Sequence, residues 1–208
     1  MDRPKLLSRA LLLALITILY NIAEGLVSTI LGFQDETIAL AGFGLDSFVE
    51  VASGIGIAHM VLRMKRPSEE GKHRFERDAL RITGTGFILL TLGLTAVSVI
   101  NIVTQHRPDN TLGGIIISGV SILTMWLLMR MKIRVGTALN SAPILADAAC
   151  TRTCFYLSFV LLTSSLVYEI FKVPYVDSIG ALAIAYFAFR EGLEALEKAR
   201  NYNLTDEK

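Results

Sequence analysis

The stretch LGGIIISGVSILTMWLLM, residues 112–129, carries no charged side chain. The hydrocarbon core of a bilayer is about 30 Å thick, and a helix needs roughly 20 apolar residues to cross it. An uncharged run of this length is typical of a membrane span and not of a helix in a soluble domain. We therefore predict a transmembrane helix over residues 112–131.

Five further apolar stretches of similar length lie on either side of this one. Irregular backbone cannot lie exposed in lipid, so they are interpreted as helices and not as barrel strands. The sequence thus predicts an all-α integral membrane protein, with a six-transmembrane-helix bundle over residues 1–200 and a frayed, charged C-terminal tail over residues 201–208. The other five predicted spans cover residues 6–31, 37–62, 79–103, 141–171 and 176–197.

The composition supports a membrane protein and excludes some other classes. Of the 208 residues, 52% are hydrophobic and the mean hydropathy is +0.52, which is too apolar for an ordinary soluble domain of this length. The formal net charge is only +1, so no electrostatic argument favours a nucleic acid partner. The expected surroundings of the chain are therefore the lipid bilayer.

Positive charge is concentrated in two of the links between the predicted spans. By the positive-inside rule, these two links face the cytoplasm. With an even number of spans, both termini are then cytoplasmic, and we expect a multi-pass protein of the cell (inner) membrane. The basic residues around the second link are Arg63, Lys65, Arg66, Lys72, Arg74, Arg77 and Arg81, and those of the fourth are Arg130, Lys132 and Arg134.

The second span contains two carboxylates, within GFGLDSFVEVASG at residues 42–54. Asp46 and Glu50 are four residues apart, so they lie on one face of a helix. An ionisable group inside a membrane costs roughly 2.5–3.5 kcal/mol on insertion scales and is a candidate for function. Two like charges this close repel unless a cation or a proton lies between them. The alternative is a pair of carboxylates satisfied by helix packing.

The fifth span contains a carboxylate and two thiols, within ILADAACTRTCF at residues 144–155. At about 100° per residue, Asp147, Cys150 and Cys154 fall on one stripe of the helix. The two cysteines are poorly placed to bond to each other. A cysteine in an apolar helix is often only a small buried hydrophobe, and this alternative stays open.

The two pairs lie at matching depths on antiparallel helices, so they can face each other near the middle of the membrane. We expect Asp46 to face Cys154 and Glu50 to face Cys150. Two oxygen and two sulfur ligands can then close a tetrahedral metal site. Such a donor set favours zinc, or a softer ion such as cadmium, over magnesium or calcium. Zn²⁺ is therefore the expected transported substrate, with Cd²⁺ or another divalent transition metal as the alternative.

The first span has a polar stripe of its own that includes Asn21 and Glu24. Glu24 can line an outer vestibule or relay protons, and Asn21 and Asp147 are further candidates for a proton relay or an accessory ligand. The alternative is a stripe that only joins neighbouring helices.

These residues resemble the cation diffusion facilitators. LDSFVE at residues 45–50 is similar to the ligand motif of the family's second helix. NSAPILADAACTRTC at residues 140–154 is similar to its fifth-helix segment, and VDSIGALAIAYFAFREGLEAL at residues 176–196 resembles its sixth helix. The resemblance covers most of the membrane region.

This resemblance implies six transmembrane helices with cytoplasmic termini and export of zinc and related ions in exchange for protons. It places the metal ligands on Asp46, Glu50, Cys150 and Cys154. Two departures from the family's pattern stand out. Cysteines replace the usual histidine and aspartate of the fifth helix, and we expect no cytoplasmic metal-binding, dimerising domain of the kind the family usually carries. We therefore expect a short form of the family, and a homodimer remains an open alternative.

Two competing functions remain. One is a metal-binding membrane protein that does not transport but modulates a partner transporter. The other is a membrane thiol enzyme, which is disfavoured because a cysteine pair four residues apart, deep in a helix, lacks the Cys-x-x-Cys spacing and the solvent access of redox motifs. The sequence therefore predicts a transporter and no enzymatic activity.

Overall fold

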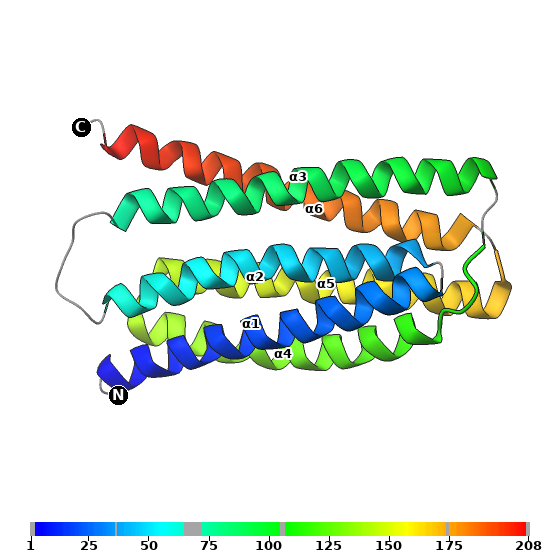
Figure 1. Ribbon diagram of the computed structural model, residues 1–208. Helices are drawn as coiled ribbons and strands as arrows, with labels where there is room; N and C mark the ends of the chain where they lie inside the picture. Colours follow the sequence, from blue (N-terminus) through cyan, green and yellow to red (C-terminus); the bar gives the residue numbers. More distant parts are fainter. Residues whose placement is uncertain (1–2, 36, 65–71, 105–106, 174, 207–208) are drawn as a thin grey trace.

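The computed structural model describes residues 3–35, 37–64, 72–104, 107–173 and 175–206, and these residues form six helices and no strands (Figure 1). The all-α membrane bundle predicted from the sequence is confirmed. Each helix matches one predicted span, and several extend further at their ends. The helices are α1 (Arg3–Gln34), α2 (Ile38–Met64), α3 (Lys72–Thr104), α4 (Leu112–Leu139), α5 (Ala142–Phe171) and α6 (Tyr175–Asp206).

Five of the described helices, α1 to α5, are long and apolar enough to cross a membrane. The remaining helix, α6, has a shorter apolar stretch, because Asp177 begins it and Arg190 and Glu191 interrupt it. It nevertheless packs along α3 and contacts α2 and α5. The sixth predicted span is thus an integral helix of the bundle, in which Asp177 is buried and Glu191 partly buried, while Arg190 is exposed.

The helices pack as two close pairs and a hairpin. α1 lies along α2 and α3 along α6, while α4 and α5 are consecutive and antiparallel (Figure 1). Glycines allow the first pair to approach closely, because a Cβ atom on Gly32 of α1 would lie 2.4 Å from the backbone nitrogen of Ala41 on α2. A Cβ on Gly84 of α3 would likewise lie 3.1 Å from the carbonyl oxygen of Gly192 on α6. Small residues at helix contacts are typical of membrane bundles.

A tight turn joins α4 and α5. Asn140 adopts a left-handed conformation with φ 49°, and the N–H of Ser141 donates to the carbonyl of Gly136 at 3.0 Å. Asparagine tolerates this backbone region better than most residues, and such a cap satisfies the last carbonyls of a helix. The turn fixes the register of the hairpin, so residues equally far from Asn140 on the two helices lie at the same level.

The start of α1, the end of α6 and the α4–α5 turn all lie at one end of the bundle, here named the termini end (Figure 1). The opposite end is the far end. The helix α6 continues to Asp206, so the boundary expected at residue 200 is not the end of a helix. Lys65 and Arg66, predicted to belong to a basic link, lie outside the described residues.

All three basic residues predicted to fill the fourth link belong to helix α4 instead, and one of them is buried. Lys132 was expected in the basic link after the fourth span, together with Arg130 and Arg134. The helix α4 continues to Leu139, and Lys132 faces α5 with only 1% of its surface exposed. Arg130 and Arg134 point away and are exposed. The apolar stripe that includes Met125 carries Lys132 into the contact with α5 because of its helical spacing.

Candidate cation site

A cavity of about 60 Å³ lies between α2, α5 and α6, with α1 and α3 completing its walls. Most of the polar residues singled out in the sequence line it. They are joined there by two acidic residues of α6, Glu191 and Glu194, to which the sequence analysis gave no role. The polar lining includes Asn21, Asp46, Glu50, Asp147, Cys150 and Glu191.

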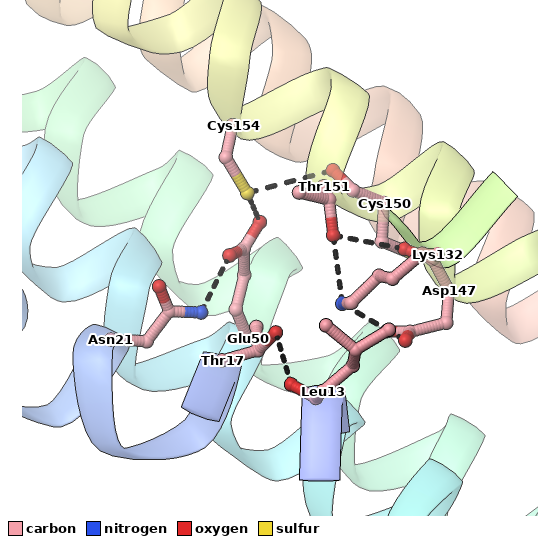
Figure 2. Close-up of polar contacts among 9 residues, drawn as sticks. All are labelled: Leu13, Thr17, Asn21, Glu50, Lys132, Asp147, Cys150, Thr151 and Cys154. Atoms are coloured by element: carbon pink, nitrogen blue, oxygen red, sulfur yellow. Dashed lines mark hydrogen bonds and ion pairs between the residues drawn. The ribbon is translucent and has the colours of Figure 1, made fainter. Parts of the chain in front are cut away.

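The two carboxylates of α2 differ in their surroundings. Asp46 is 3% exposed, and no hydrogen-bond partner for its Oδ1 is found among the described residues. Glu50 is fully engaged: Asn21 Nδ2 donates to its Oε2 at 2.9 Å, and the thiol of Cys154 donates to its Oε1 (Figure 2). A buried polar atom without a partner is costly, so Asp46 Oδ1 is a candidate atom for binding a ligand.

The contact between Glu50 and Cys154 differs by about one helical turn from the expected pairing of Asp46 with Cys154. A Cβ on Gly180 of α6 would lie 2.4 Å from Ser164 Oγ and 3.4 Å from Ala39 Cβ, so Ser164 on α5 and Ala39 on α2 are level. About three turns towards the termini end from that level lead to Glu50 on one helix and Cys154 on the other.

The expected pairing rested on depths measured from opposite ends of the two spans, Asp46 from the far end of α2 and Cys150 from the termini end of α5. These two ends lie further apart than that pairing requires, by about one helical turn. In the structure, α5 ends at Phe171, about two turns beyond the level at which α2 begins with Ile38. Asp177, at the start of α6, fixes the beginning of α2 by accepting from the backbone N–H of Ile38 at 2.7 Å.

The two cysteines are free thiols in different positions. Cys150 is partly buried and lines the cavity, whereas Cys154 is 3% exposed and reaches Glu50. Within the described part of the chain, no three His, Cys, Asp or Glu side chains are close enough together to hold a metal ion. Asp46, Glu50 and Cys150 thus line one cavity, and Cys154 contacts Glu50 behind its wall. The four are not arranged as a metal cage, and their role as ligands stays a prediction.

Asp147 is engaged by a buried lysine. Lys132 Nζ lies 2.9 Å from Asp147 Oδ2 and donates to Thr151 Oγ1, also at 2.9 Å (Figure 2). The hairpin turn at Asn140 explains this contact, since Lys132 and Asp147 are nearly equidistant from it. Asp147 lines the cavity, but its charge is compensated inside the protein. The sequence missed this pair because Lys132 was assigned to a link.

The candidates on α1 divide between two locations. Asn21 lines the cavity and holds Glu50, and its Oδ1 has no hydrogen-bond partner among the described residues. Glu24 is buried and does not line the cavity. It accepts from Tyr20 at 2.8 Å and from Ser47 at 3.2 Å. Glu24 therefore lies beside α2. Its depth in the bundle is close to that of Asp46, and it is nearer to the far end than Glu50 is.

Glu191 of α6 is a further residue that the sequence analysis missed. Its side chain lines the cavity, and Thr153 Oγ1 of α5 donates to its Oε1 at 2.8 Å. Glu191 lies in a charged segment, FREGLEALEK, that looks like the solvated end of a helix. The helical spacing from Ala188, which is fully buried, was the available signal that Glu191 faces inward.

A family model described as the cation efflux transmembrane domain matches residues 10–202. The chain belongs to the cation efflux family. A curated relative from Methanocaldococcus jannaschii, described as an uncharacterized transporter, is 28% identical over 181 residues, which is 82% of this chain and 62% of the relative. The chain therefore spans about three fifths of the length of that relative.

This membership confirms the resemblance drawn from the motifs of α2, α5 and α6. Cation efflux proteins are membrane transporters of divalent metal cations and not enzymes. The cavity of this chain lies between α2 and α5, which carry the residues that the resemblance identifies as ligands.

Proposed function

We propose that this cation efflux protein exports a divalent transition-metal cation, zinc in the first place and cadmium as the alternative, in exchange for protons. The cation binds between α2 and α5, at Asp46, Glu50, Cys150 and Cys154. The observation that carries the proposal is the buried Asp46 Oδ1, which has no partner among the described residues and lines a cavity together with Cys150 and Glu50.

The donor atoms support a borderline or soft metal. Carboxylate oxygens alone suit magnesium or calcium, whereas thiolates favour zinc and its softer relatives. Cys150 and Cys154 supply the sulfur, and Asp46 and Glu50 supply the oxygen. A modest movement of α5 against α2 is needed to bring all four around one ion, because Glu50 and Cys154 are in contact with each other in this structure.

The same contact supports an exchange with protons. The thiol of Cys154 donates its hydrogen to Glu50, so one proton is held between these two groups. A metal binds cysteine as the thiolate, and binding must therefore release that proton. Return of a proton to Cys154 weakens the site and favours release of the metal. An inward proton gradient then drives the cation outward.

The shape of the cavity supports loading from the cytoplasm. Along α6 its lining residues become more exposed towards the termini end: Ala188 is buried, Glu191 is partly buried and Glu194 is exposed. The cavity thus opens at the termini end, where α4 carries the exposed Arg130 and Arg134. By the positive-inside rule this end is cytoplasmic, which suits a protein of the cell membrane that exports its substrate.

A flux measurement tests the proposed function. Purified protein in sealed vesicles is expected to carry zinc into the lumen several-fold faster when the lumen is more acidic than the medium. The lumenal pH, reported by an enclosed dye, should rise as zinc enters, because protons leave in exchange. Protein-free vesicles under the same gradient provide the control. Zinc flux that does not depend on the pH gradient and moves no protons would indicate a uniporter instead of an exchanger.

A second prediction concerns the metal preference. The double variant Cys150→His, Cys154→Asp carries the usual ligands of the family, and it should lose cadmium affinity relative to zinc by roughly tenfold, because thiolates favour the softer ion. Competitive binding to the purified protein measures the ratio. An unchanged cadmium-to-zinc ratio would mean that the thiols are packing residues and not ligands. The same would follow if the single alanine variants of both cysteines bound zinc as tightly as the parent.

The second candidate function is a metal-binding membrane protein that modulates a partner transporter. It is favoured by one observation, namely that no three candidate ligands among the described residues are arranged around one point. The vesicle experiment separates the two functions. A protein that binds zinc and moves none would fit this second function.

A further inference from the structure

One face of α6 lines the cavity along a helical stripe. Ala188, Glu191, Ala195 and Lys198 follow one another at intervals of three or four residues, and Glu194 lies beside them. Nothing in the motifs of α2 and α5 involves this face. It nevertheless supplies the charged residues between the buried ligands and the mouth of the cavity.

The charges of the lining residues are compensated unequally. Lys132 neutralises Asp147 at 2.9 Å, and Lys198 neutralises Glu194 at 2.6 Å. In the part of the chain that the structure describes, none of the remaining three carboxylates, Asp46, Glu50 and Glu191, forms an ion pair. Three carboxylates without a counter-ion around one small cavity repel one another unless a cation or protons join them.

Two buried atoms show that this acidic group is open to a ligand. Asp46 is 3% exposed and Asn21 is 1% exposed, and both line the cavity. Asp46 Oδ1 and Asn21 Oδ1 each have no hydrogen-bond partner among the described residues. The amide oxygen of Asn21 only accepts, and the oxygen of Asp46 only accepts when the carboxylate is ionised, so the group that satisfies them is then a cation or a hydrogen-bond donor.

Glu191 is held towards the same space from the opposite wall. Thr153 of α5 donates a hydrogen bond to Glu191 Oε1. Thr153 immediately precedes Cys154 in the chain. Its side chain is partly exposed, between the buried Ala188 and the exposed Glu194. Thr153 and Cys154 are adjacent on α5, so Glu191 lies at the depth of Glu50, and a cation that enters from the termini end meets both before it reaches Asp46.

We propose that Glu191 is a substrate-binding residue of the cavity, which holds the divalent cation against the two carboxylates of α2. This inference rests on the proposed function and adds a residue of α6 to the path of the cation. A carboxylate at this point attracts the divalent ion into a narrow space and is compensated by it.

Removal of this charge provides the test. Glu191→Gln keeps the shape of the side chain and its bond to Thr153. We expect the zinc concentration for half-saturation, both of equilibrium binding to the purified protein and of flux in vesicles, to rise about tenfold, as for the loss of one charge-assisted contact. The maximal flux should change less. The matched control is Glu197→Gln, an exposed carboxylate of α6 that does not line the cavity, with an expected change below about twofold.

A structural role for Glu191 makes a different prediction. If Glu191 only joins α6 to α5, then Thr153→Val, which removes the hydrogen-bond donor, should reproduce the whole defect. On our proposal Thr153→Val has a smaller effect than Glu191→Gln. A normal half-saturation of Glu191→Gln, or an equal defect in Thr153→Val, would overturn the role of Glu191.

Zinc binding and flux of the parent protein distinguish a failure of this proposal from a failure of the proposed function. Zinc binding without flux in the parent would contradict transport, while the binding comparison would still decide the role of Glu191. A parent that neither binds nor moves zinc would overturn both.

Discussion

Asp46→Asn is expected to abolish zinc transport and to weaken zinc binding at least 100-fold. The substitution keeps the size of the side chain and removes its negative charge from the cavity. Loss of an outer-shell partner alone typically costs about 10–100-fold in metal affinity, and the loss of a ligand costs at least as much. Isothermal titration of the purified protein with zinc, together with vesicle flux, measures both effects.

The same variant should be at least as stable as the parent when no metal is present. Asp46 is almost completely buried and has an oxygen without a partner, so the neutral amide removes a cost of burial. Zinc should raise the midpoint of thermal unfolding of the parent, because a ligand that binds only the folded state stabilises it. That increase should be lost in Asp46→Asn.

Asp109→Asn provides the control for this experiment. Asp109 is an exposed carboxylate in the link between α3 and α4, at the far end of the bundle, and lies outside the cavity. Its variant should keep zinc binding, flux and the zinc-induced stabilisation. Zinc affinity of Asp46→Asn equal to that of the parent would show that the cation does not bind in this cavity.

The helices and the candidate residues of α2 and α5 were predictable because their signals are local. A run of apolar residues marks a span by its length alone, as over residues 112–131. Ionisable and thiol groups inside such a run stand out against their neighbours, as Asp46 and Cys150 do. Their faces follow from helical periodicity, which needs no knowledge of the other helices.

The relative depth of two helices was not predictable in the same way. It depends on how far α5 extends past the start of α2, and the short links tolerate several offsets. The start of α6 contacts both helices: Asp177 accepts from Ile38 of α2, and Ser164 of α5 donates to the carbonyl of Val176. The first contact joins residues far apart in the chain. An error of one turn was enough to pair Cys154 with Asp46 in place of Glu50.

The sequence also did not predict which charged residues near the ends of the spans face the interior. A lysine or glutamate there is usually solvated, so composition assigned Lys132 to a link and gave Glu191 no role. Both face the interior, because their helices continue beyond the apolar stretches. On α4, the residues at helical spacing from Met125 to Val135 are buried. Lys132 belongs to this series, but its charge interrupts the uncharged run of residues by which a span is recognised.

Lys132→Met is expected to destabilise the protein strongly, by about 3–5 kcal/mol in the free energy of unfolding. Lys132 is 1% exposed and holds Asp147 at 2.9 Å, so its loss leaves a carboxylate without a counter-ion between α4 and α5. Breaking a buried ion pair from one side costs this much, whereas replacing both members by apolar residues is often neutral. The double variant Lys132→Met, Asp147→Leu should therefore recover most of the stability. Denaturant unfolding in detergent measures the three proteins side by side.

Zinc should affect the single variant more than the parent. Without Lys132, Asp147 becomes a fourth uncompensated carboxylate on the wall of the cavity, so a divalent cation there relieves more repulsion. The zinc-induced rise in the unfolding midpoint is thus expected to be larger in Lys132→Met than in the parent and to return to the parental value in the double variant. An unchanged stability of Lys132→Met would show that the ion pair adds nothing to the fold. A zinc effect equal in all three proteins would place the bound cation away from Asp147, beyond the reach of its charge.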